Sequence, residues 1–115
     1  MDYDFTAEIM QMLQALGDSE YQKTSWFNKG PYVSSPGEML CSYFDDYDVP
    51  GWIRERAAKL SAQQGADLVA LDNAMKEFSA STDEFPDPTL VIVDPRWLRI
   101  RELAQKAHAS LAPGQ

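Results

Sequence analysis

The sequence has little of what metal sites and covalent catalysis require. Its 115 residues include one cysteine and one histidine, Cys41 and His108. A structural zinc site needs several such ligands, and a lone cysteine forms no disulfide within the chain. Glycine-rich phosphate loops and nucleophile elbows are also missing. We therefore expect a protein that is not an enzyme and has no metal and no cofactor. An all-oxygen magnesium or calcium site at Asp45, Asp46 and Asp48 is the remaining alternative, although no EF-hand pattern surrounds them.

Long apolar runs and basic residues are also scarce. The longest purely apolar runs, 68–71 and 90–93, are far shorter than the ~20 residues of a membrane span. Ten basic residues stand against 18 acidic ones, which gives a net charge of -8. Nucleic acids and anionic membranes attract basic surfaces, so the composition argues against both as partners. The N-terminus lacks the basic and apolar regions of a secretory signal, and we expect a cytoplasmic protein.

The negative charge is concentrated in the first half of the chain. Residues 1–50 carry nine acidic side chains against Lys23 and Lys29, whereas residues 51–115 carry nine acidic and eight basic ones. A field of this kind attracts a cationic partner and speeds its arrival.

Apolar residues at helical spacing predict a mostly α fold, a compact single-domain bundle of about five helices spanning 1–115. The expected helices are 5–16, 36–47, 50–60, 66–79 and 95–111, with a break at 63–65 before the fourth. We interpret 18–34 as a loop with limited extended structure, although Asp18 or Ser19 could cap a helical turn there. The run 90–93 is either a short strand or an apolar linker, and the tail 112–115 is expected to be disordered.

Several residues are typical of helix ends. Asp2 and Asp4 are candidate caps for the first helix, and Gly17 is expected to end it in the left-handed conformation. Ser35 and Glu38 predict a capping box, and Asp94 before Pro95 predicts the start of the last helix. Trp97 lies on the expected core stripe of that last helix, whereas Trp26 could be a core or a contact residue.

An acidic cluster lies at the C-terminal end of the expected second helix. Asp45, Asp46 and Asp48 lie near its C-terminus, where negative charge opposes the helix dipole at a cost of a few tenths of a kcal/mol per charge. Tyrosine and tryptophan, which are favoured at protein interfaces, stand beside the cluster. The candidate partner-binding residues are Asp45, Asp46, Asp48, Tyr43, Tyr47 and Trp52. The alternative is a solvated helix face whose aromatic stripe belongs to the core.

Three segments carry a family resemblance: Ser19-Glu20-Tyr21-Gln22 followed by Trp26, Tyr43-Phe44-Asp45-Asp46, and Asp94-Pro95-Arg96-Trp97 before an alanine-rich final helix. They resemble segments of a family of small acidic bacterial proteins of unsettled function. In size, acidity and lack of catalytic equipment, the chain is also similar to immunity proteins of contact-dependent growth inhibition and related polymorphic-toxin systems. That resemblance implies a cognate toxin domain as the partner, frequently a basic nuclease. It transfers no contact residues, because immunity proteins share no common binding motif.

The leading hypothesis is therefore an immunity protein that captures a basic toxin domain by complementary charge. A small acidic regulatory or scaffold subunit of a cellular complex is the alternative. An enzyme that uses carboxylates is a more remote third.

Overall fold

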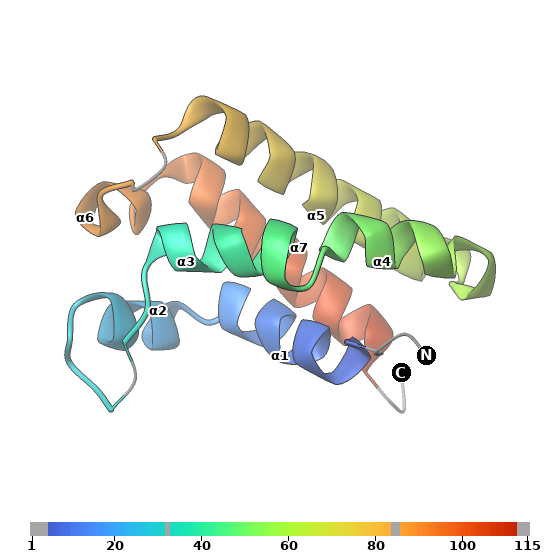
Figure 1. The fold of residues 1–115 in the computed structure, drawn as a ribbon, viewed down its shortest axis with the longest axis horizontal. Helices are drawn as coiled ribbons and strands as arrows, with labels where there is room; N and C mark the ends of the chain where they lie inside the picture. Colours follow the sequence, from blue (N-terminus) through green and yellow to red (C-terminus); the bar gives the residue numbers. More distant parts are fainter. Residues whose placement is uncertain (1–4, 32, 84–85, 113–115) are drawn as a thin grey trace.

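The chain folds into helices joined by short connections (Figure 1). The computed structural model describes residues 5–31, 33–83 and 86–112. Within this part of the chain there is no strand, and the elements are α1 (Thr6–Leu16), α2 (Ser19–Trp26), α3 (Pro36–Cys41), the π-helical segment η1 (Ser42–Asp46), α4 (Val49–Arg56), the 3-10 turn η2 (Ala57–Lys59), α5 (Ala62–Ser81), α6 (Pro88–Val91) and α7 (Pro95–Leu111). The mostly α fold class is confirmed, but the described residues form seven α-helices rather than about five.

The two additional α-helices, α2 and α6, lie where the sequence suggested loops or a strand. Asp18 caps α2 by accepting a hydrogen bond from the backbone N–H of Tyr21 at 3.0 Å. Interpreting 18–34 as a loop is therefore wrong for α2, and the alternative of a turn capped by Asp18 holds. Asp87 caps α6 in the same way, so the strand considered for 90–93 is also wrong. A single capped turn forms a helix there without needing a long apolar stripe.

The second and fourth expected helices also differ from the structure. The segment 36–47 is not one α-helix, because its second half is the π-helical η1. The break expected at 63–65 is absent, because α5 already begins at Ala62. Ser61 and Gln64 form a reciprocal capping box that starts α5 ahead of Gly65. This box satisfies two backbone N–H groups and offsets the low helix propensity of glycine.

The ends of the first and last helices test the remaining cap predictions. Ser35 and Asp94 cap α3 and α7 as predicted, but the described Glu38 side chain makes no return bond to the backbone of Ser35, so the predicted capping box is only half formed. Gly17 ends α1 in the right-handed conformation, so the left-handed stop is wrong. Glycine is needed there for space, because a Cβ would lie 2.8 Å from the Cγ of Gln105 on α7. Asp2 and Asp4, like residues 113–115 of the tail, lie outside the described residues.

The core lies where α7 packs against α1 and α5. Trp97 of α7 is fully buried, as the sequence predicted, and its ring contacts those of Trp26 and Phe78 with centroids 5.5 Å apart in both pairs. The other fully buried apolar side chains are those of Ile9, Leu13, Leu16, Tyr43, Val49, Leu68, Leu71, Met75, Ile100, Ala104 and Ala107. The connection α3–η1–α4 covers this core between α1 and α5 (Figure 1).

One polar side chain is built into this core. Gln22 of α2 is fully buried, and its amide nitrogen donates to the carbonyls of Ala15 and Leu16 at 2.9 and 2.8 Å. Its amide oxygen accepts from Trp97 Nε1 at 3.0 Å and from Arg101 Nη2 at 3.1 Å. These four bonds use the two donors and both lone pairs of the amide. Gln22 therefore joins the C-terminus of α1 to α2 and α7.

The longest described helix, α5, has 20 residues and carries polar and charged side chains along its length. None of the described helices has the combination of length and apolarity that a membrane crossing requires.

Replacing Gln22 by methionine keeps the side chain's bulk but removes all four hydrogen bonds. Each buried group left without a partner costs about 1–3 kcal/mol, so we expect the free energy of unfolding to fall by about 3 kcal/mol or more. Urea denaturation followed by circular dichroism measures the loss. The control is Gln14→Met at an exposed site of α1, which should change stability by less than about 0.5 kcal/mol. Equal stabilities of the two variants would contradict the role given to Gln22.

Candidate binding site

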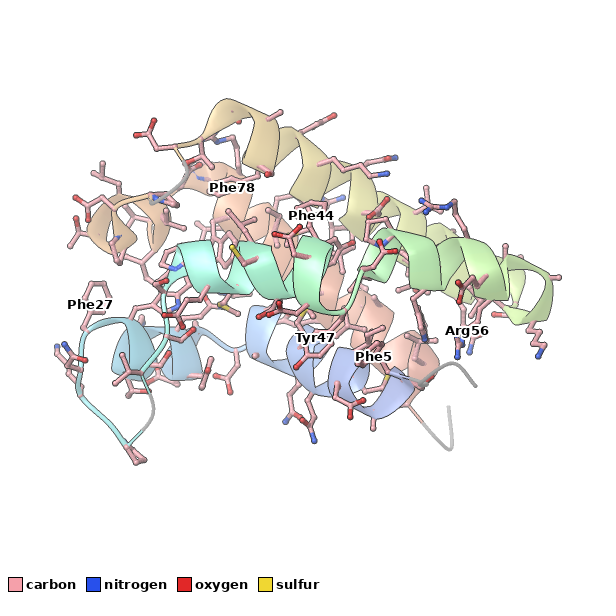
Figure 2. The ribbon with its side chains drawn as sticks, in the orientation of Figure 1. Phe5, Phe27, Phe44, Tyr47, Arg56 and Phe78 are labelled. Carbon is pink, nitrogen blue, oxygen red and sulfur yellow. The ribbon has the colours of Figure 1, made fainter. Side chains whose placement is uncertain are left out.

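The six candidate partner-binding residues do not form one surface. Tyr43 is 0% exposed and Trp52 is 7% exposed, so both belong to the core. Tyr47 is half-buried, whereas the three aspartates are exposed. Figure 2 shows Tyr47 beside Phe5, and the centroids of the two rings lie 5.5 Å apart. The exposed part of the cluster is therefore the three carboxylates, together with part of the Tyr47 side chain.

Tyr43 attaches η1 to α5. Its hydroxyl donates to Asp72 Oδ1 at 2.8 Å, and Asp72 Oδ2 pairs with Lys76 Nζ at 2.8 Å. Burial raises the pKa of the Tyr43 hydroxyl far above its usual range, and the negative charge and hydrogen bond of Asp72 raise it further. The side chain has a structural role at the interface between these two elements.

Trp52 attaches α4 to α1. Its indole Nε1 donates to Thr6 Oγ1 at 3.3 Å. The guanidinium of Arg56 lies over the indole, 4.9 Å from the ring centroid, and adds a cation–π contact. The indole thus makes a hydrogen bond through its nitrogen and a cation–π contact through its ring face, both within the protein.

Asp48 has a different role from the one the sequence suggested. It is the N-cap of α4, where its Oδ1 accepts from the backbone N–H of Gly51 at 3.2 Å. Its φ of 43° lies in the left-handed region, which aspartate tolerates better than most residues. Counting Asp48 as an unfavourable charge at a helix C-terminus is therefore wrong, because a carboxylate at the start of a helix is stabilising.

Asp45 and Asp46 have no such role in the fold. Among the described residues, no basic side chain lies within ion-pair distance of either carboxylate. Asp46 accepts one long hydrogen bond, 3.4 Å, from Ser42 Oγ. Both belong to η1, where the backbone N–H of Tyr47 reaches back five residues to the carbonyl of Ser42. Short π-helical segments within α-helices are frequent at functional sites.

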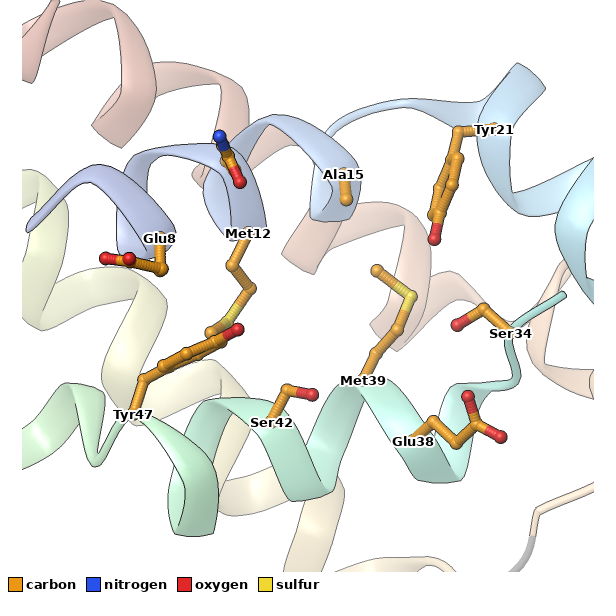
Figure 3. A pocket seen from close by; sticks show the side chains of 10 residues that line it. Glu8, Met12, Ala15, Tyr21, Ser34, Glu38, Met39, Ser42 and Tyr47 are labelled. Carbon is orange, nitrogen blue, oxygen red and sulfur yellow. The ribbon is translucent and has the colours of Figure 1, made fainter. Parts of the chain in front are cut away.

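An open groove of about 210 Å³ lies between α1 and the continuous segment α3–η1 (Figure 3). It is lined by Glu8, Gln11, Met12, Ala15, Tyr21, Ser34, Glu38, Met39, Ser42 and Tyr47. Figure 3 shows the two methionines in the middle of the groove, with Glu8 and Glu38 toward its opposite ends. The sequence reasoning missed this groove, because its walls come from segments that are far apart in the chain. The one available signal was Tyr47, a tyrosine at the end of the expected apolar stripe.

A second hollow of about 280 Å³ lies on the other side of α3–η1, against the end of α5. Asp45 and Asp83 line it, together with Phe44 and the exposed Cys41. We name residues 36–46 the α3–η1 ridge, because they stand between the two hollows.

The described residues contain no cluster of three or more histidine, cysteine or carboxylate side chains placed to hold a metal ion. In comparisons with known proteins, no family model, no curated protein and no solved structure matches the chain. The candidate site is therefore defined by its own geometry, as an acidic ridge beside a groove.

Tyr43→Phe tests whether Tyr43 is structural. Removing the buried hydroxyl that bonds Asp72 should lower the free energy of unfolding by roughly 1–2 kcal/mol at neutral pH. The raised pKa of Tyr43 adds a pH dependence: the stabilisation is complete below the ordinary tyrosine value of 10.0 and is lost as the pH rises above it, because the unfolded chain then releases the proton. Denaturation curves at neutral and alkaline pH should therefore show a smaller alkaline loss in Tyr43→Phe than in the wild type. Tyr47→Phe, the control, should keep the wild-type loss.

Asp48→Ala should destabilise the protein by about 1 kcal/mol or more, because α4 loses its N-cap. Asp48→Asn keeps both a capping oxygen and a residue that tolerates positive φ, so its stability should stay near the wild type. Asp45→Ala is the matched control and should change stability by less than about 0.5 kcal/mol. Thermal or urea unfolding of the three variants checks this order. Equal losses for Asp48→Ala and Asp45→Ala would overturn the separation between the capping and the free aspartate.

Proposed function

We propose that the protein binds a basic partner protein through the α3–η1 ridge, and that it is an immunity protein which neutralises a cognate bacterial toxin domain. The observation that carries the proposal is the pair Asp45 and Asp46. Both carboxylates are exposed, and neither forms an ion pair with a described residue or caps a described helix.

The charge around the ridge supports a cationic partner. Neither hollow beside the ridge is lined by a lysine or arginine. Lys23, one of the two bases in the first half of the chain, already pairs with Glu20 at 3.9 Å. An acidic surface without balancing bases raises the association rate of a basic protein, and salt weakens the effect.

The contacts that we propose differ from the first set of candidates. Tyr43 and Trp52 leave it, because their side chains are used within the core. Asp45, Asp46 and the exposed part of Tyr47 remain as proposed contacts. Asp48 caps α4, and its charge adds to the negative electrostatic field of the ridge. The groove beside the ridge adds a concave surface to this set.

The choice of a toxin as partner rests on the resemblance in size, acidity and lack of catalytic equipment. An immunity protein needs a surface complementary to its toxin and no catalytic groups of its own. A regulatory or scaffold subunit could use the same ridge, and a test of toxicity separates the two functions.

The test begins with the tagged protein expressed in its native host, with the retained partner identified by mass spectrometry. We expect one basic protein at one-to-one stoichiometry, encoded by the adjacent upstream gene. That protein should arrest growth when expressed alone and become harmless when co-expressed with this chain. A retained partner that is not toxic would favour the subunit, and a toxic partner without protection would overturn the proposal.

The charge mechanism predicts the behaviour of the double variant Asp45→Asn/Asp46→Asn. Its association rate with the partner should fall roughly threefold to tenfold at low salt, with little change in the dissociation rate. The matched control is Glu77→Gln/Glu102→Gln, which removes the same charge from exposed sites on α5 and α7. Stopped-flow or surface-plasmon measurements over a salt series check the difference. Equal rates for the two double variants would remove the ridge as the steering surface.

A further inference from the structure

We propose that the groove between α1 and the α3–η1 ridge receives an arginine side chain of the partner. This inference rests on the proposed function, since it takes the partner to be a basic protein. It adds the chemical group that is recognised and the place where that group binds.

The middle of the groove suits the aliphatic stem of such a side chain. Met12 and Met39 line the groove from α1 and α3, and Ala15, with its small side chain, lines it from α1 as well (Figure 3). Methionine is flexible and polarisable, so it adapts to an inserted chain. The three methylenes of arginine bury themselves on apolar surface of this kind while the charged end stays at the rim.

The rim supplies acceptors in several directions. Glu38 is exposed on the first turn of α3, and Figure 3 shows Tyr21 and Ser34 toward the same end of the groove. Hydroxyl groups of Ser34, Ser42 and Tyr47 also line the groove. None of the described residues that line the groove is a lysine or arginine, so a guanidinium at this end would meet one carboxylate and several hydroxyls.

The arrangement favours arginine over lysine. The acceptors come from separate elements, and the guanidinium has five donors in one plane, whereas an ammonium has three at a point. The half-buried ring of Tyr47 lines the groove away from Glu38. Figure 3 shows this ring beside Met12, next to the position that the alkyl stem would occupy.

The first experiment uses the full chain with ¹³C-labelled methionine methyl groups, titrated with Nα-acetyl-arginine amide and followed by NMR. We expect the methyl signals of Met12 and Met39 to shift with saturation. The signal of Met75, which is fully buried on α5, should stay in place. The corresponding citrulline amide, which is uncharged and nearly the same shape, should produce no saturable shift. The lysine amide should bind more weakly than the arginine amide.

The variant Glu38→Gln tests the rim. Losing an exposed carboxylate partner should raise the Kd for the arginine amide roughly threefold to fivefold. Glu77→Gln, which makes the same change of charge on α5, should leave this Kd unchanged. Unshifted Met12 and Met39 methyls, equal responses to arginine and citrulline, or equal Kd values for the two variants would overturn the arginine site.

These outcomes are independent of the test of the proposed function. If Met12 and Met39 respond as expected but no toxin is neutralised, the arginine groove stands and the immunity function falls. If a toxin is neutralised but the methyl groups do not respond, the immunity function stands and the arginine groove falls.

Discussion

The buried amide of Gln22 is the constraint on which the arrangement of the helices depends. It binds two carbonyls in the last turn of α1 and the indole of Trp97 on α7, so it fixes two helices that no chain connection brings together. The Gln22 amide and the Trp97 indole are fully buried, so water would not replace a partner that either of them lost. The indole fixed in this way then packs between Trp26 and Phe78, which extends the constraint to α2 and α5.

The candidate site follows from this arrangement. With one side of α1 held against α7, another side remains to support the α3–η1 ridge. Tyr43 fastens the ridge to α5, and Trp52 fastens α4 to α1, each by a hydrogen bond from its aromatic side chain. The ridge is thus held directly through Tyr43 and, by way of the following helix α4, through Trp52. The small side chain of Ala15 lines the groove that remains beside the ridge. The site is a surface held in place by the core, which favours binding with little rearrangement.

The sequence predicted the helices that have a long apolar stripe or a clear cap, and it missed the short elements of only one or two turns. The stripes of α1 and α7, and the caps Ser35 and Asp94, were visible because local rules decide them. The short helices α2 and α6 have too few residues for a periodic pattern, and the π-helical turn at Ser42 has no sequence signal of its own. The groove could not be predicted, because its walls meet only after α1 and α3 pack. Tyr43 and Trp52 were proposed as contacts for the same reason: their partners, Asp72 and Thr6, are distant in the sequence.

The acidic cluster divides into charges that the fold uses and charges that it does not. Asp48 caps α4 and would be favoured in any protein with this turn. Asp45 and Asp46 are neighbours of like charge in η1, and they stabilise no helix start and no ion pair among the described residues. In the proposed function this pair serves a partner outside the chain, and the distance dependence of electrostatics determines how the two charges would act. Exposed charges would act on such a partner over about 8 Å in physiological salt, which affects mainly the rate of encounter. In the same proposal the groove between α1 and the ridge would act only at contact, where shape and hydrogen-bond geometry decide which side chain stays.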